Sequence, residues 1–362
     1  MALWTVFRSV LVPIWRWTWN HGPVSSFGRL EMLAETPEST PKAPPKANAS
    51  STRVSSLLLA SFAAVYFLWG ATFFAIRIGV ESFPPLVLAG LRHLSVGLVF
   101  YPLFRRISGE KPTLRQWRTT IVTGVLLLLC GNGTVSWAEK VIPSGIAALL
   151  VATVSLWMVL ADWFRPGGLR PAPRVLASLV LGFAGMALLV GPKHLGGAER
   201  VNPWGAFALV LASLAWAIGS IYSKHHPIPN SAMLGVAMQM VAGGTALLVV
   251  AGISGEYREL HLAQVSLRSW MALGYLAVFG SALGFSAYVY ILKHGTAARV
   301  ATYAFVNPVV ALFLGWLLGG EALTLRTLLA SAVILTAVIL VITMPHKDPI
   351  EADEAIPAPG EA

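Results

Sequence analysis

The sequence predicts an all-α integral membrane protein with ten transmembrane helices in two inverted five-helix repeats. Two observations lead to this fold class. Hydrophobic residues make up 56% of the 362 residues and charged residues only 12%, whereas a soluble domain has about 25% charged residues. A motif near the start of the apolar region also returns later in the chain, which indicates an internal repeat.

Ten apolar stretches are long enough to cross a bilayer, which takes about 20 mostly apolar residues. Prolines mark several of their ends, among them Pro85, Pro143 and Pro203. The predicted spans cover residues 56–78, 85–104, 119–138, 144–163, 174–191, 203–223, 231–252, 269–292, 298–319 and 325–344. The first five form the predicted repeat 56–191, and the last five form the repeat 203–344.

The two ends of the chain differ from the spans in composition. Residues 1–54 combine tryptophans and scattered cations with a stretch rich in Pro, Ala, Ser and Thr, so they are predicted to be disordered or interfacial. Met32 lies just before that stretch, and a chain that begins there is expected to insert like the full one. Residues 345–362 are predicted to be a disordered tail. The one cysteine, Cys130, lies in an apolar run, so an intrachain disulfide is excluded.

The distribution of Lys and Arg predicts the orientation. If the N-terminus is cytoplasmic, the inner connections carry eleven of these cations and the outer ones six, with the largest group between residues 105 and 118. Because cytoplasmic loops are enriched in Lys and Arg, both termini are expected inside. The net charge of +10 comes from short clusters between apolar runs rather than from one basic face. This pattern favours anionic lipid over nucleic acid as the partner of the cations.

Two pairs of similar segments define the repeat. VYFLWGATFFAIR and ASLAWAIGSIYSK each place a tryptophan eight residues before a cation, at Trp69 and Arg77 and at Trp216 and Lys224. SGIAALLVATVSLWMVLADW and TAARVATYAFVNPVVALFLGW have nearly the same offset. Each half holds an odd number of spans, so corresponding helices cross in opposite directions, as in many secondary transporters. Eight helical residues span about 12 Å, so Trp69 and Trp216 are expected near the bilayer centre, on opposite sides of the pseudo-twofold axis.

Several of these residues resemble those of a known family. Trp69 to Phe73 followed by Arg77, Arg92 early in the second span, and YAFVNPVVALFLGWLLGGEALT are similar to the EamA family of the drug/metabolite transporter superfamily. The resemblance covers about residues 56–344. It implies a ten-helix inner-membrane carrier of small metabolites, often an exporter.

The first half departs from the family pattern at two positions. Ser155 occupies the place of a usual proline, and Leu169 lies near the place of a usual glutamate. The helix break in the first half is therefore not expected to match that near Pro308 in the second half.

The candidate substrate-binding residues each have an aromatic ring, an amide or a charge within or close to a span. They are Trp69, Arg92, Asn132, Trp157, Trp216, Tyr288, Tyr303 and Asn307. Arg92 either supplies a positive charge for a substrate carboxylate near the outer mouth of a cavity, or extends to the membrane interface. His93 is the candidate for proton coupling, because imidazole titrates near neutral pH, or it is a hydrogen-bonded packing residue.

No motif of an ATPase or of a common enzyme class occurs in the sequence. The patterns GxxxxGK[ST], HExxH, CxxC and GxSxG are absent. No cofactor or metal is therefore predicted, and transport is expected to use proton antiport or facilitated diffusion. Two alternatives stay open: a polytopic membrane enzyme that uses His93 with Asp162 or Glu139, and a non-transporting sensor or scaffold. The expected partners are a small-molecule substrate and the lipid bilayer of the plasma membrane, with a homodimer left open.

Overall fold

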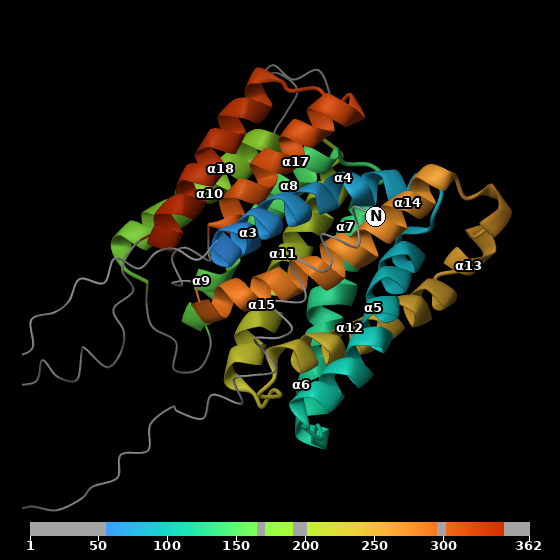
Figure 1. Cartoon of the computed structure of the whole chain (residues 1–362). Coiled ribbons are helices and arrows are strands. Elements are labelled where there is room, and N and C mark those ends of the chain that lie inside the picture. The colour runs from blue at the N-terminus through green and yellow to red at the C-terminus, as the bar shows by residue number, and fades with distance from the viewer. Residues whose placement is uncertain (1–55, 165–170, 191–200, 295–301, 344–362) are drawn as a thin grey trace, which may run out of the picture.

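The computed structural model describes residues 56–164, 171–190, 201–294 and 302–343, and within these ranges every regular element is a helix (Figure 1). The predicted tails lie outside the described residues. The first half contains α3 (Ser56–Ala64), η2 (Val65–Trp69), α4 (Gly70–Gly79), α5 (Pro85–Ser108), α6 (Leu114–Gly124), η3 (Val125–Gly133), α7 (Thr134–Ala138), α8 (Ser144–Ala152), α9 (Val154–Phe164) and α10 (Pro173–Val190). The second half contains α11 (Pro203–His225), α12 (Ala232–Ile253), α13 (Glu256–Glu259), η5 (Leu262–Gln264), α14 (Leu267–Tyr275), η6 (Leu276–Leu283), α15 (Gly284–His294), α17 (Tyr303–Gly319) and α18 (Leu325–Thr343).

Seven helical stretches of the described residues are long and apolar enough to cross a membrane. They are Ser56–Gly79, Pro85–Ser108, Leu114–Ala138, Ser144–Phe164, Pro203–His225, Ala232–Ile253 and Leu267–Ile291. The other three predicted spans correspond to the shorter apolar helices Pro173–Leu189, Tyr303–Gly319 and Leu325–Leu340. An all-helical, multi-pass chain is therefore confirmed, whereas ten crossings stay a prediction.

The third span begins earlier than the sequence predicted. Its first helix, α6, starts at Leu114 rather than at residue 119 because Thr113 and Gln116 form a capping box, in which the Gln116 backbone N–H donates to the Thr113 hydroxyl and the Gln116 side chain accepts from the Thr113 backbone. This motif starts a helix regardless of hydropathy. The apolar window therefore missed the first polar turn.

Three of the spans contain π-helical segments. η3 and η6 lie in the third span of each half, at corresponding positions, and η2 lies in the first span. The counterpart of η2 in the second half, α11, is α-helical throughout. Because π-helical turns are often found at functional sites, these segments direct attention to the places where η2, η3 and η6 meet other helices.

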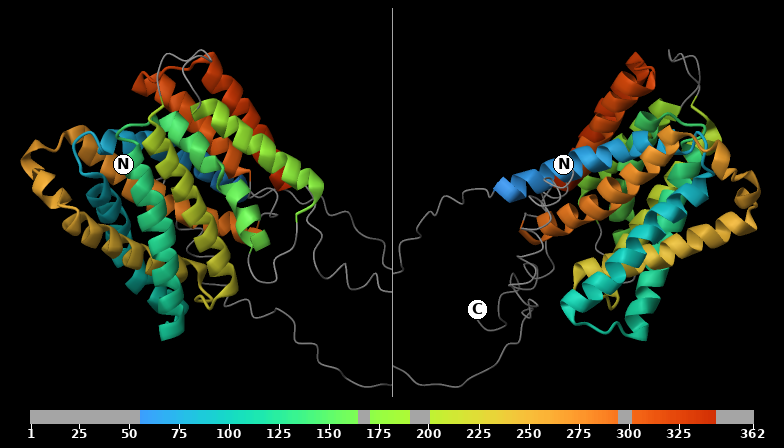
Figure 2. Two further views of the ribbon diagram at one scale, coloured as in Figure 1. Left: turned by 180° about the vertical axis from the view of Figure 1, so that it is seen from behind. Right: turned by 45° about the vertical axis from the view of Figure 1, so that its right-hand side comes forward.

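Helices α5 and α12, the second span of each half, pack closely against each other. A Cβ added at Gly97 would lie 2.7 Å from the Val241 backbone nitrogen, and one at Gly244 would lie 2.6 Å from that of Leu94. Small residues let membrane helices approach this closely. The last spans of the two halves, α10 and α18, also run side by side and form one edge of the molecule (Figures 1 and 2).

Carboxylates from elsewhere in the chain hold the starts of three spans. Glu256 Oε2 accepts from the backbone N–H groups of Leu86 (2.9 Å) and Val87 (3.1 Å) in α5. Glu110, after α5, accepts in turn from the backbone N–H groups of Asn230 (3.0 Å) and Ser231 (2.7 Å), directly before α12. These two contacts link the halves reciprocally.

The third carboxylate belongs to Glu321, which follows α17. Glu321 accepts from the backbone N–H groups of Ser144 (2.7 Å) and Gly145 (3.1 Å) at the start of α8. A negative charge at a helix N-terminus satisfies unpaired backbone donors and is favoured by the helix dipole. The corresponding position of the first half, near Leu169, lies outside the described residues.

These contacts predict a selective loss of stability. Glu110→Ala and Glu256→Ala should each cost about 1–2 kcal/mol, because each removes the acceptor for two backbone donors at a helix start. The temperature of half-unfolding of the purified protein in detergent measures the loss. Glu81→Ala is the control, since that carboxylate has only an exposed contact with Arg268 at 3.9 Å. Equal midpoints for all three variants would contradict the assignment.

Candidate functional site

Trp69 stands at the centre of an aromatic cluster that joins the first, eighth and ninth predicted spans. Its ring centroid lies 4.9 Å from that of Tyr288, 5.3 Å from that of Phe285 and 5.5 Å from that of Tyr303. The indole Nε1–H donates to the backbone oxygen of Gly280, in η6, at 3.0 Å. The aromatic cluster, defined by Trp69, Phe285, Tyr288 and Tyr303, is thus held against a π-helical segment.

Arg92 reaches the same π-helical segment from α5. Its side chain is 5% exposed, and its Nε donates to Ser281 Oγ at 2.9 Å. A Cβ on Gly280 would lie 3.4 Å from the Arg92 guanidinium. Arg92 therefore points into the protein, and the alternative in which it extends to the membrane interface is wrong.

Further polar groups line the junction of η2, α4 and η6. The Thr72 hydroxyl donates to the Trp69 backbone oxygen at 2.5 Å, and the Tyr275 hydroxyl donates to that of Leu68 at 3.2 Å. Side chains of α4 and α14 thus donate to two backbone carbonyls of η2.

A matching contact occurs in the other half. Trp216 of α11 packs against Gly131 of η3, where an added Cβ would lie 2.9 Å from the indole ring. The corresponding Gly284 leaves even less room, since its added Cβ would lie 2.4 Å from Trp69 Nε1. In each half, a first-span tryptophan thus covers a glycine of the third span in the other half. Asn132, half-buried, directly follows Gly131.

The remaining candidate residues are dispersed. Asn307 is buried one turn after Tyr303, and its Oδ1 has no hydrogen-bond partner. Trp157 packs instead on Phe183 of α10, with ring centroids 4.9 Å apart. The candidate residues therefore fall into groups: the aromatic cluster with Arg92 and Asn307 forms one group, Asn132 with Trp216 forms a second, and Trp157 lies with the fifth span.

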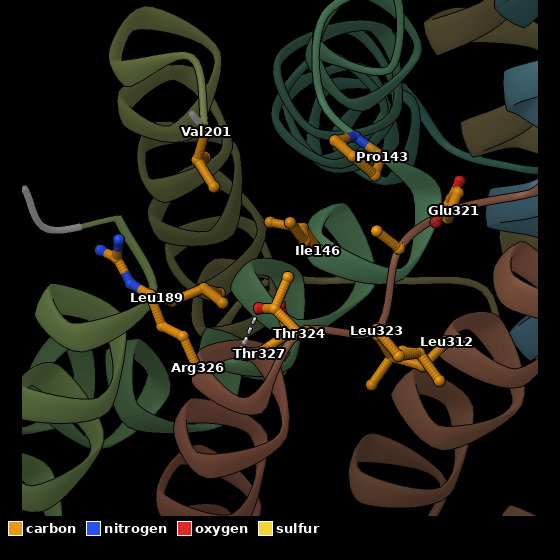
Figure 3. A pocket seen from close by; sticks show the side chains of 11 residues that line it. Pro143, Ile146, Leu189, Val201, Leu312, Glu321, Leu323, Thr324, Arg326 and Thr327 are labelled. Atoms are coloured by element: carbon orange, nitrogen blue, oxygen red, sulfur yellow. Dashed lines mark hydrogen bonds between the residues drawn. The ribbon is translucent and has the colours of Figure 1, made fainter. Parts of the chain in front are cut away.

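A small pocket near the starts of α8 and α18 is separate from these groups. Figure 3 shows Pro143, Ile146, Leu189 and Leu312 around it, with Glu321 and Arg326 at its rim. Glu321 already holds the start of α8, and Arg326 Nε donates to the Leu188 backbone oxygen at 2.6 Å. In the described part of the chain, no group of three or more His, Cys, Asp or Glu residues could hold a metal ion.

Comparison with known proteins identifies the family. The model of the EamA-like transporter family matches the chain twice, at residues 55–191 and 203–343. The chain belongs to the EamA-like transporter family. The resemblance drawn from Trp69 to Phe73, Arg92 and residues 303–324 is thereby confirmed.

Relatives of this EamA-like transporter include bacterial membrane proteins. The uncharacterized inner membrane transporter YedA of Escherichia coli K12 is 41% identical over 286 residues, which cover 78% of this chain and 90% of YedA. The probable amino-acid metabolite efflux pump of the same strain is 26% identical over 289 residues, which cover 75% of this chain and 90% of the pump. A solved crystal structure shares the fold, with a TM-score of 0.53 and 20% identity over 79% of this chain and 96% of its own.

These findings confirm the expected location and coarse function. The protein is a multi-pass transporter of the bacterial inner membrane, and a small molecule is its expected cargo.

Sequence reasoning missed several residues of the site. Ser281 and Gly280 were not among the candidate residues, and Glu139 was named only as an alternative catalytic partner. Glu139 is 0% exposed, and neither carboxyl oxygen has a hydrogen-bond partner. The sequence feature that could have drawn attention to Glu139 was its position directly after an apolar span. Charged residues at such positions are equally often exposed at the membrane interface.

The contact between Trp69 and Gly284 yields a matched pair of variants. Gly284→Ala should cost about 1–3 kcal/mol, because the new methyl group overlaps an indole ring that is fixed by its bond to Gly280. Gly274 lies on α14, and a Cβ added there has nothing within 4 Å. The unfolding midpoint of Gly274→Ala should therefore stay equal or rise. Both midpoints are measured in detergent. In a Trp69→Ala background, Gly284→Ala should no longer lower the stability, because the ring that it overlaps is gone. If the stability losses of the two single variants instead added up in the double variant, the contact would be contradicted.

Proposed function

We propose that this EamA-like transporter is a secondary transporter for small amphipathic metabolites that carry a carboxylate. The observation that carries the proposal is the meeting of Trp69 and Arg92 at adjacent residues of η6, Gly280 and Ser281. An aromatic face binds apolar surface, and a guanidinium binds a carboxylate through paired hydrogen bonds. Such a junction suits a ligand with one apolar and one anionic end.

The burial of Arg92 supports a role in binding. A charge inside a membrane protein is costly and commonly marks a substrate or ion pathway. The hydroxyl of Ser281 satisfies one of the five guanidinium N–H donors. The remaining donors give a substrate carboxylate a place to bind.

The proposed mechanism is alternating access between two inverted five-helix halves, 56–191 and 203–344, with ten crossings and both termini in the cytoplasm. It is supported by the two family matches and by the paired tryptophan and glycine contacts. In this scheme, one half rocks against the other around a site near the bilayer centre. Export is the proposed direction, in line with the similarity to the probable amino-acid metabolite efflux pump of Escherichia coli K12.

The test uses two probes with the same phenyl ring and three-carbon chain but different polar ends: hydrocinnamate ends in a carboxylate, and hydrocinnamyl alcohol ends in a neutral hydroxyl. Trp69→Ala should weaken binding of both by about tenfold, because contact area is lost. Arg92→Gln should weaken only hydrocinnamate, also by about tenfold, because a charge-assisted bond is lost. Affinities are measured with the purified protein in detergent, and uptake is measured in liposomes.

Trp316→Ala is the matched control, since that indole is 50% exposed on α17. It should leave both affinities unchanged. If Arg92→Gln weakened both probes equally while the variant stayed folded, the carboxylate assignment would be wrong. If neither probe bound the unmodified protein, the proposed substrate class would be wrong.

A further inference from the structure

Glu139 is the most unusual charged residue in the described part of the chain. It is the first residue after the span Leu114–Ala138. Its side chain is fully buried, and both carboxyl oxygens lack a hydrogen-bond partner. Glu110, Glu256 and Glu321 are only partly buried, and each accepts backbone hydrogen bonds, so Glu139 differs from them in both respects.

Two arginines lie near this carboxyl, but each hydrogen bond found for them goes elsewhere. The Arg77 guanidinium donates to the backbone oxygen of Glu139 rather than to its side chain. Arg92 donates through Nε to Ser281. Both guanidinium groups nevertheless act electrostatically on the Glu139 carboxyl.

The other charged groups around Glu139 are few. Glu321, after α17, adds a negative charge, and Lys140 follows in the chain with an exposed side chain. His93 adjoins Arg92 on α5 and is also buried. Helix α11 packs against α7 as well, but its charged or titratable residues, Tyr222, Lys224 and His225, lie at its opposite end.

An ionised carboxyl in this position would be a buried charge without a hydrogen bond. Such a charge costs several kcal/mol, whereas the neutral acid avoids most of that cost. Burial accordingly raises the pKa of Glu139 well above its usual value, and Glu321 adds to this effect. Arg77 and Arg92 oppose it by favouring the charged form of the carboxyl.

We infer that Glu139 is a proton-binding residue, and that its protonation favours the binding of an anion at Arg92. The second part rests on the proposed function. When Glu139 is ionised, its negative charge attracts the Arg92 guanidinium and repels an incoming carboxylate. When Glu139 is protonated, Arg92 is free to serve a ligand, and by linkage the bound ligand raises the proton affinity of Glu139 by the same factor.

The sign of this linkage has a consequence for transport. Proton and carboxylate favour each other, which is opposite to the competition that proton antiport of an anion requires. A proton and a carboxylate that bind together would cross together, so efflux would be driven by the substrate's own gradient and not by an exchange for protons. Of the two driving forces considered for this chain, the linkage therefore argues against proton antiport.

The first test needs no substrate. Infrared spectroscopy of the purified full chain at about pH 7 should show the carbonyl band of a protonated carboxyl, although exposed glutamates with a pKa of about 4.3 are ionised there. Glu139→Gln should abolish the band, whereas the controls Glu81→Gln and His93→Gln should keep it. A missing band in the unmodified protein, or a band that survives in Glu139→Gln, would overturn the inference. If the Gln variant is unstable, Glu139→Asp keeps an acid and should shift the pH midpoint of the band.

The second test addresses the linkage to Arg92. Arg92→Gln removes a positive charge and should raise the pH midpoint of the band, as should Arg77→Gln, whereas the exposed Arg268→Gln should not. An unchanged midpoint in Arg92→Gln and Arg77→Gln would contradict electrostatic coupling between these groups.

The third test separates the inference from the proposed function. Hydrocinnamate affinity should fall by about tenfold as the pH rises through the midpoint, and the fall should be absent in Glu139→Gln. A pH-independent affinity would refute the linkage but leave the substrate proposal intact. Absence of any hydrocinnamate binding would refute the substrate proposal, while the infrared result would still decide the proton site.

Discussion

The reciprocal contacts of Glu110 and Glu256 are the constraint on which the arrangement of the two halves depends. Inside a membrane, unpaired backbone donors are costly, and each helix start leaves several of them. Glu256 binds the start of α5, and Glu110 binds the backbone in front of α12. Because each carboxylate belongs to the opposite half, the second spans are fixed relative to each other at both ends. Their glycine-lined contact can then be tight along its length.

The paired tryptophans extend this arrangement to the interior. Trp69 covers Gly284, and Trp216 covers Gly131, so each half covers a glycine of the other. The two junctions are not equivalent, however. Only Trp69 lies in a π-helical segment, donates to Gly280 and is surrounded by three further aromatic rings. We therefore propose that substrate binds at the Trp69 junction, where Arg92 donates to Ser281, next to Gly280.

The sequence predicted some of these features for physical reasons and missed others. Hydropathy identifies helices because every span must be apolar, and the repeated tryptophan reveals the two halves. Trp69, Tyr288 and Tyr303 were expected around one site, and the structure brings them together. The direction of Arg92 could not be predicted, since a long side chain near a helix start can point outward or inward. The Glu139 carboxyl lacks a hydrogen-bond partner while Arg77 and Arg92 donate to other atoms. No local sequence pattern reveals this arrangement. Trp157 lies with the fifth span because it packs against Phe183 of α10, a contact between helices that the sequence alone does not show.

A reversible crosslink across the Trp69 junction tests the central claim, that substrate crosses between two halves that must separate there. An added Cβ at Gly280 lies 2.8 Å from Thr72 Cγ2, so Thr72→Cys with Gly280→Cys, in a Cys130→Ser background, places two thiols within disulfide reach. The measurement is hydrocinnamate uptake into liposomes before and after oxidation. We predict that the disulfide abolishes uptake and that a reductant restores it. Undiminished uptake by fully crosslinked protein would contradict the proposed movement.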